Sequence, residues 1–281
     1  MQHEGFSRTA YLVALRRAAH QSLDSPKIFD DPLACRILDP IDDPRRKNFA
    51  RRADTRRRAF MAVRSRYAED QLARATARGV RQYVILGAGL DTYAYRSQSG
   101  VRVFEVDHHS TQSWKRRLLH QSGIAIPDAV TFVPADFERE PLDQTLLANG
   151  FRLDQPAFFA WLGVTMYLTR ESAVGTFRFI ASMPAGSGVA FDYVLDPAEL
   201  SPGLRFRQHL IARAVAGLGE PFRLYFRPSD LAQLLKELGF SAVEDLGPAE
   251  IDERYFAGRN DGLRVSPGWG HLCSAWVILD R

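Results

Sequence analysis

The side chains with the clearest chemical meaning follow two short apolar runs in the first half of the chain. Gly87 and Gly89 come directly after Tyr83–Leu86, a run that suits a strand buried on both faces. Asp107 ends the next run, Val101–Val106, and lies twenty residues beyond Gly87. Glycines let the backbone turn sharply and approach a ligand, and a carboxylate at the end of the neighbouring strand can accept hydrogen bonds from a ribose diol. This spacing predicts a nucleotide-type site.

The residues after the glycines distinguish between two cofactors. A dinucleotide fingerprint needs a third small residue where this chain has Thr92, and Asp91 would repel a pyrophosphate docking there. A cofactor with a ribose, an amine and a sulfonium but no phosphate fits better, and this describes S-adenosyl-L-methionine (SAM). Two alternatives stay open at this point: a nicotinamide dinucleotide, and a glycine turn of an ordinary strand–helix unit.

The same stretch carries a resemblance to a known family. LGAGLDT (86–92), then Arg96, then FEVD (104–107) resembles the leucine carboxyl methyltransferase family, including its bacterial branch of class I SAM-dependent O-methyltransferases. The resemblance runs from about residue 8 to the C-terminus, and its motif is far more specific than two glycines. It implies SAM as the cofactor. The cofactor-binding residues that we predict in this stretch are Gly87, Ala88, Gly89, Asp91, Glu105 and Asp107.

The resemblance also assigns roles outside this stretch. In the family, an arginine of the N-terminal segment binds the methionine carboxylate of SAM, and the matching position is Arg66, with Arg64 as the near alternative. A bidentate guanidinium suits a carboxylate, although a single arginine is more often a surface residue. Asp136 and Phe137 follow a strand predicted around residues 130–133. There the acid can accept from the adenine amine while the ring packs on the base, and the family's adenine-binding acid falls at Asp136.

The end of the fourth predicted strand, residues 157–161, departs from the family pattern. Many relatives place a glutamate just before the glycine at 163, where this chain has Trp161 and Leu162. We therefore expect an apolar floor, with Leu162 against the cofactor. Tyr167 matches a family tyrosine near the substrate carboxylate; the alternative is that it only packs under the following helix.

From Gly79 onward, strands and helices alternate, which is the signature of an α/β doubly wound sheet. A helix at 228–238 and strands at 240–246 and 272–279 resemble the C-terminal end of class I methyltransferases, where the last strand is antiparallel. The predicted fold is therefore a Rossmann-like, doubly wound, seven-stranded, mostly parallel sheet.

Two additions to this domain are expected. Helices at 8–20 and 33–38, and one or two more between Pro44 and Gly79, predict an N-terminal helical cap over residues 1–78, before a catalytic domain at 79–281. Glycines and prolines interrupt the alternation of strands and helices at 198–227. We interpret these residues as a lid insertion over the active site and call them the lid segment.

Composition limits the other possibilities. The formal net charge is +4, and between Arg45 and Arg66 ten basic residues accompany one acid, Asp54. This basic segment suits a solvated helix face or an acidic substrate or carrier protein. It does not favour nucleic acid, because aromatic residues are not interleaved for stacking. Clustered metal-ligand spacings, a signal sequence and a membrane-length apolar run are all missing, so we expect no metal, no membrane association and a soluble, cytoplasmic protein.

The predicted activity is methyl transfer from SAM to a carboxylate or hydroxyl of a small molecule or natural-product intermediate. An ionised carboxylate needs no general base, and no catalytic base stands out in the sequence. A hydroxyl acceptor would use a histidine, for which His108, His109 and His209 are candidates. Two alternatives remain, a SAM-binding protein without transfer activity and a nicotinamide-dependent oxidoreductase.

Overall fold

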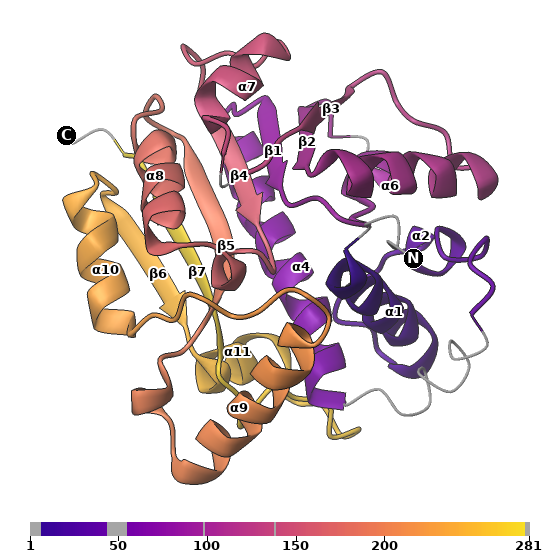
Figure 1. The fold of residues 1–281 in the computed structure, drawn as a ribbon, viewed down its shortest axis with the longest axis vertical. Helices are drawn as coiled ribbons and strands as arrows, with labels where there is room; N and C mark the ends of the chain where they lie inside the picture. Colours follow the sequence, from indigo (N-terminus) through magenta and orange to yellow (C-terminus); the bar gives the residue numbers. More distant parts are fainter. Residues whose placement is uncertain (1–6, 44–54, 98, 138, 279–281) are drawn as a thin grey trace.

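The computed structural model describes residues 7–43, 55–97, 99–137 and 139–278. A twisted sheet runs through the centre of the molecule with helices on both faces (Figure 1). Its seven strands have the order β3-β2-β1-β4-β5-β7-β6. They are β1 (Gln82–Leu86), β2 (Arg102–Asp107), β3 (Val130–Pro134), β4 (Ala157–Trp161), β5 (Gly188–Val194), β6 (Ala242–Leu246) and β7 (Gly270–Trp276).

The pairing of the strands confirms the predicted fold class. β1 pairs in parallel with β2 and β4, β2 with β3, and β4 with β5, whereas β7 is antiparallel to both β5 and β6. The last strand of the chain is thus inserted between its two neighbours. The strand order reverses between β1 and β4, and ligands of open α/β sheets bind beyond the carboxyl ends of the strands at such a point.

Helices and short 3-10 turns connect the strands. The helices are α1 (Arg8–Leu23), α2 (Leu33–Arg36), α4 (Thr55–Ala77), α5 (Tyr93–Arg96), α6 (His109–Gln121), α7 (Leu142–Ala148), α8 (Arg170–Ala181), α9 (Pro202–Ala216), α10 (Pro228–Glu237) and α11 (Pro248–Tyr255), and the turns are η1 (Thr165–Tyr167) and η2 (Pro197–Glu199). Among the described helices, none is long and apolar enough to cross a bilayer. Residues 44–54, which hold half of the basic segment and the start of the predicted long helix, lie outside the described residues.

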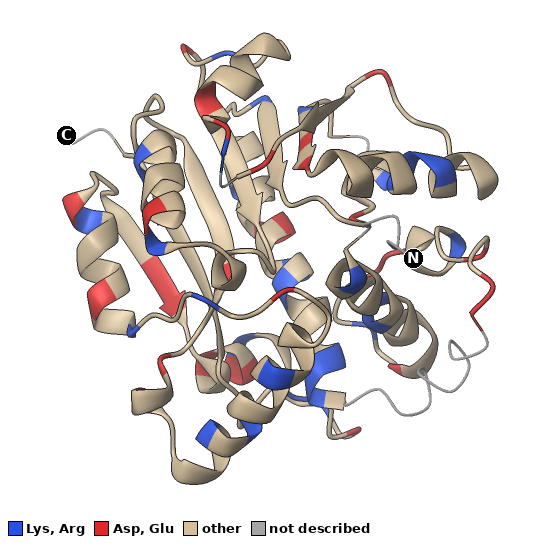
Figure 2. Ribbon diagram, viewed as in Figure 1, with Lys and Arg blue, Asp and Glu red and all other residues tan. Residues whose placement is uncertain are grey.

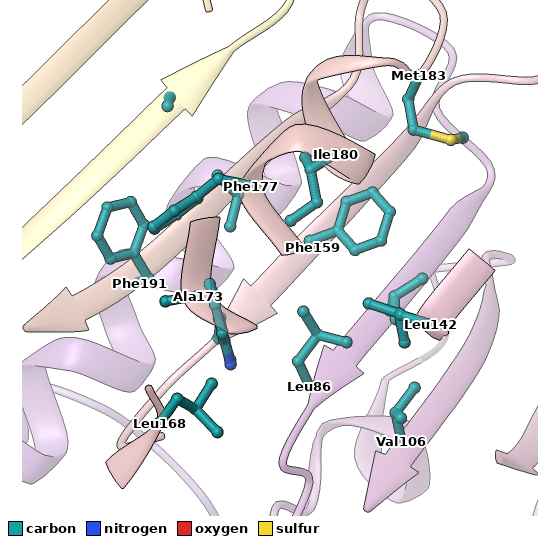
Figure 3. Packing of buried hydrophobic residues seen from close by; sticks show 14 of the residues in the cluster. Leu86, Val106, Leu142, Phe159, Leu168, Ala173, Phe177, Ile180, Met183 and Phe191 are labelled. Atoms are coloured by element: carbon teal, nitrogen blue, oxygen red, sulfur yellow. The ribbon is translucent and has the colours of Figure 1, made fainter. Parts of the chain in front are cut away.

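Strand residues alternate between two apolar layers. Leu86, Phe159 and Phe191 are fully or almost fully buried on the face that α7, α8 and α10 cover (Figure 3). Ile85 and Phe158 point to the other face, which α4 and α11 cover. Because both faces are covered, the central strands read as continuous apolar runs in the sequence.

The described N-terminal helices lie in two places. α4 packs along one face of the sheet, with Val63 and Tyr67 fully buried, and contacts β4, β5 and β7. α1 and α2 instead form a separate apolar cluster with α6, to which Leu15 of α1 and Leu119 of α6 contribute. Of the described part of residues 1–78, α1 and α2 are the elements that lie at the sheet edge rather than on its face.

Candidate active site

A cavity of about 850 Å³ lies at the carboxyl edge of the sheet. Its walls come from the ends of β1 to β5, from α1 and α4, and from two parts of the lid segment, α9 and residues 218–223. Small-molecule sites span roughly 300–1,000 Å³, so the volume lies in the upper part of the range and suits more than one small ligand.

The glycines after β1 form one end of the cavity. Gly87 and Gly89 have φ of +70° and +46°, in the left-handed region that glycine adopts without strain. A Cβ at Gly87 would lie 2.3 Å from Cγ2 of Val164, so no side chain fits there. The amide nitrogen of Gly87 donates to the carbonyl of Val106 at 2.8 Å, which ties the turn to β2. These contacts keep the backbone exposed to the cavity, and we call residues 87–89 the glycine cradle.

Asp107 lies directly beside the glycine cradle. One carboxylate oxygen accepts the amide of Gly89 at 2.6 Å, and the other accepts the amide of His108 at 2.7 Å. Burial raises the pKa of Asp107, and these two amides offset only part of that effect. The carboxylate is therefore held in a fixed orientation, with acceptor capacity left for a ligand.

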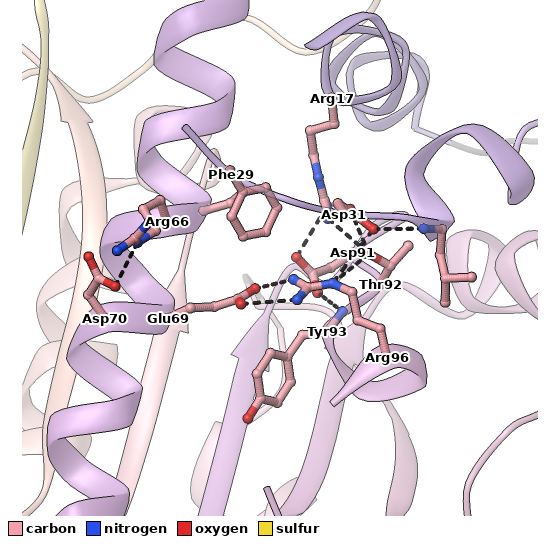
Figure 4. A network of polar contacts seen from close by, with 12 residues as sticks. Arg17, Phe29, Asp31, Arg66, Glu69, Asp70, Asp91, Thr92, Tyr93 and Arg96 are labelled. Carbon is pink, nitrogen blue, oxygen red and sulfur yellow. Dashed lines mark hydrogen bonds and ion pairs between the residues drawn. The ribbon is translucent and has the colours of Figure 1, made fainter. Parts of the chain in front are cut away.

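A buried polar network fixes the loop that follows (Figure 4). Arg17 of α1 donates to Asp91 at 3.2 Å and to Thr92 at 3.0 Å, and it also pairs with Asp31. The amide of Tyr93 donates to Asp91 at 2.7 Å. Burial alone would raise the pKa of Asp91, but the positive charges nearest to it, led by Arg17, lower it overall. Asp91 is thus an ionised residue that anchors α1 to the loop after the cradle.

Arg96 extends this network to α4. It pairs with Glu69 through two hydrogen bonds and lies 3.6 Å from Asp31. No local sequence pattern points to Arg17, Asp31 or Glu69, because the partners in this network are far apart in the chain.

Most of the predicted site residues meet at this cavity. Its lining includes Gly87, Ala88, Gly89, Asp91, Asp107, Asp136, Phe137, Leu162 and Tyr167. Asp136 and Phe137 come from the end of β3, next to Asp107 at the end of β2. Residues that are up to 80 positions apart, Gly87 and Tyr167, therefore surround a single space.

A match to the family model for leucine carboxyl methyltransferase covers residues 10–181, more than half of the chain. The chain belongs to the leucine carboxyl methyltransferase family. It is 31% identical over 291 residues to the Bacillus subtilis protein named "Putative S-adenosyl-L-methionine-dependent methyltransferase YktD", covering 94% of this chain and 95% of that protein. A Mycobacterium avium protein, also named "Putative S-adenosyl-L-methionine-dependent methyltransferase", is 34% identical over 210 residues, covering 69% of this chain and 67% of the relative.

A solved structure supports the fold. The crystal structure of a DUF574 family protein from Streptomyces avermitilis superposes with a TM-score of 0.58 at 21% identity, covering 92% of this chain and 99% of that chain. Membership of the leucine carboxyl methyltransferase family places the chain among SAM-dependent methyltransferases and confirms SAM as the predicted cofactor. The residues present fit this cofactor, because the glycine cradle leaves room for backbone contact and Asp107 can accept from a ribose diol.

The structure does not bring Arg66 to the cavity of this methyltransferase. Its side chain is 50% exposed and pairs with Asp70 at 2.7 Å on the outer surface of α4. Arg64 lines the cavity instead, with its Nη1 3.0 Å from Asp192 of β5. Residues two positions apart point to different sides of a helix, so only one of the two arginines can face inward. Arg64 is therefore the better candidate for the SAM carboxylate.

The structure does not place Glu105 at the cavity either. Its side chain is fully buried and pairs with Lys115 of α6 at 2.7 Å, while the Tyr95 hydroxyl donates to it at 2.9 Å. Burial raises the pKa of Glu105 against the opposing effect of Lys115. A strand rises about 3.3 Å per residue, so Glu105 lies roughly two such steps behind Asp107, under α6. Glu105 therefore anchors β2 to α6 and does not line the cavity.

Tyr167 lines the cavity beside the lid segment. Its ring is 5.6 Å from that of Phe222 in the lid segment. Burial, with the charge of Glu220 next in size, raises the pKa of Tyr167 to about 12, so its hydroxyl is protonated at neutral pH. His108 also lines the cavity, whereas His209 lies in a separate hollow on the outer side of α9.

Proposed function

We propose that this protein is a cytoplasmic SAM-dependent O-methyltransferase that acts on a carboxylate or hydroxyl of a small molecule or natural-product intermediate. The observation that carries the proposal is the division of one cavity. The glycine cradle and Asp107 occupy one end, and the end under the lid segment has space for a second molecule. Family membership supplies the reaction class.

Within this proposal, the residues at the cradle end hold the cofactor. Asp107 accepts from the ribose diol, Asp136 and Phe137 contact the adenine, and Arg64 pairs with the methionine carboxylate. Leu162 forms an apolar floor. The Arg17–Asp91 contact is a positioning element, because it ties α1 to the loop next to the cradle.

The remaining elements have a covering role in the proposal. The catalytic domain is residues 79–281, and the helices of residues 1–78 together with the lid segment (198–227) close the cavity. A direct contact supports this closure, since Ser7 and Thr9 at the start of α1 both donate to Glu220 of the lid segment. Two segments far apart in sequence therefore meet above the cavity.

SAM supplies an electrophilic methyl group, so the protein must hold an acceptor oxygen about 3 Å from it and in line with the breaking bond. A carboxylate acceptor is already ionised at neutral pH and loses no proton. The Tyr167 hydroxyl can donate a hydrogen bond that orients such an acceptor. For a hydroxyl acceptor, His108, a histidine of the lining, could take the proton.

Transfer of a tritiated methyl group from SAM to a panel of carboxylic acids, phenols and alcohols, with amines and thiols as comparison acceptors, tests the proposal. Label in the product shows methyl transfer, and treatment with mild base separates the two oxygen classes, because methyl esters release methanol and methyl ethers do not. Binding of SAM without labelled product from any oxygen acceptor would favour a SAM-binding protein without transfer activity. Label on nitrogen or sulfur alone would reject O-methylation.

A further inference from the structure

Charged side chains are divided unequally between the two ends of the cavity. The cradle end has the carboxylates of Asp91, Asp107 and Asp136, and Arg17 beside them is held by Asp91 at 3.2 Å. The opposite end has arginines from the first turn of α4, from α9 and from the segment after α9: Arg56, Arg57, Arg207 and Arg223. From the same elements, Glu220 is the one acid among the described lining residues, and Ser7 and Thr9 already donate to it. Figure 2 shows basic residues on α9 and on the first turns of α4.

The walls between these arginines are apolar and aromatic. Phe60 of α4, Ile211 and Val215 of α9, and Phe222 line the cavity here. Trp269, at the end of the loop before β7, completes this wall, and the Arg207 guanidinium lies 5.8 Å from the centre of its ring. A guanidinium held against an aromatic face keeps its N–H donors available around its edge. This end of the cavity therefore combines an apolar surface with fixed positive charge.

We propose that the methyl acceptor is an amphipathic anion. It has an apolar, ring-containing body that packs on Trp269 and Phe222. It also has an anionic group, a carboxylate, sulfonate or phosphate, that Arg207 binds at a distance from the methylated oxygen. Arg207 is thus a specificity-determining residue. The inference rests on the proposed function, because it places the acceptor in the same cavity as the cofactor.

The physical reason is the cost of burying an anion beside apolar walls. A partly desolvated anion needs paired, charge-assisted hydrogen bonds, and arginine provides two from one plane. A neutral molecule with the same body would gain only the apolar contacts. The cavity should therefore discriminate between two molecules that differ only in the anionic group.

Two fluorescent probes provide that pair: 8-anilinonaphthalene-1-sulfonate, and N-phenyl-1-naphthylamine, which has the same rings without the sulfonate. Both are titrated into the full-length protein saturated with S-adenosylhomocysteine (SAH). We expect the sulfonate to bind at one site and at least about tenfold more tightly than the neutral probe, the size of a charge-assisted hydrogen-bonded contact. Equal affinities, or tighter binding of the neutral probe, would overturn the inference.

Variants locate the probe. Arg207→Gln should lower the affinity for the sulfonate probe about tenfold and leave the affinity for the neutral probe unchanged. The same change at Arg213, an exposed residue of α9 outside the cavity lining, should alter neither. Phe206 is 63% exposed in the separate hollow on α9. If Phe206→Ser rather than Arg207→Gln abolishes sulfonate binding, the probe occupies that hollow and the inference fails. SAH affinity, measured in each variant, reports on the cofactor site separately, so failure of the proposed function remains distinguishable.

Discussion

The two ends of the cavity differ in whether main-chain or side-chain groups define their shape. At the cradle end, main-chain groups define the shape, with glycines at positive φ and with Asp107 held by two backbone amides. At the lid end, side chains define it: arginines and aromatic rings carried by α9 and by the segments around it. Backbone geometry suits a cofactor that never changes, and side chains allow acceptor specificity to change without altering the fold. We therefore expect substitutions at the two ends to affect different ligands.

The largest effect is expected at the glycine cradle. Gly87→Ala would place a Cβ 2.3 Å from Val164, and it adds left-handed strain of about 1–2 kcal/mol. We expect SAH affinity to fall more than about a hundredfold, because the cradle must move away from the ligand, with a further loss of stability from the clash. Calorimetric titration and urea unfolding measure the two effects.

Gly100→Ala is the matched control for this change. Gly100 has the same φ of +70°, but nothing lies within 4 Å of its Cβ position. It should lose a similar amount of stability from strain and keep its SAH affinity. If both variants lose affinity equally, general destabilisation rather than the cradle explains the result.

Removing the carboxylate beside the cradle should have the next largest effect. Asp107→Ala takes away the acceptor for the ribose diol, so we expect SAH affinity to fall about tenfold to a hundredfold, as for the loss of hydrogen bonds to a charged group. In the wild type, affinity should decline as the pH falls through the pKa of Asp107, which lies above its usual 3.8. Calorimetric titrations with SAH at a series of pH values measure the loss of affinity and its pH dependence. If the alanine variant shows the same pH dependence of affinity as the wild type, Asp107 is not part of the site.

Stability should respond to pH with the opposite sign. Because the pKa of Asp107 is raised on folding, the folded protein binds this proton more tightly than the unfolded chain does. The contribution of Asp107 to stability is therefore greatest below its ordinary pKa and decreases as the pH rises through the raised value. The loss of stability caused by Asp107→Ala should therefore become smaller as the pH rises through this interval. Urea unfolding of both proteins at several pH values measures it.

The smallest effects separate the two arginines of α4. Arg64→Lys keeps a positive charge opposite Asp192 but loses the planar pair of donors, so SAH affinity should fall about tenfold. Arg66→Gln breaks an exposed pair with Asp70 and a long, 3.4 Å hydrogen bond to the carbonyl of Ile28, and it should change stability by less than about 1 kcal/mol. It should leave SAH affinity unchanged. Calorimetric titration with SAH compares the two variants. A loss of SAH affinity in Arg66→Gln alone would show that Arg66, as the sequence predicts, binds the SAM carboxylate.

The difference between the two ends also explains what the sequence could predict. Apolar runs, positive-φ glycines and an acid at a strand end are local features, so the cradle and Asp107 could be located from spacing. The antiparallel position of β7 came from family resemblance, because no local pattern specifies which neighbour a strand pairs with. The short helices α7 and α11 were missed, since seven or eight residues are too few for a clear helical period.

The two residues that the structure places away from the cavity, Arg66 and Glu105, were assigned wrongly because their surroundings depend on contacts that are distant in sequence. α4 buries polar residues such as Arg58 and Gln71 beside its alanines, so its sequence shows no clear apolar stripe and does not tell which of Arg64 and Arg66 faces inward. Glu105 shares a face of β2 with Asp107, and only the position of α6 shows that Lys115 covers it. The lid end depends on contacts between α4, α9 and the loop before β7, which are non-local in sequence.

Calorimetric titration of the purified protein with SAM and SAH, with NAD as the comparison ligand, tests the central claim most directly. We expect both sulfur cofactors to bind at one site per chain in the micromolar range, and NAD not to bind. Binding of NAD, or silence from both SAM and SAH, would contradict the assignment of the glycine cradle and Asp107 to a SAM site.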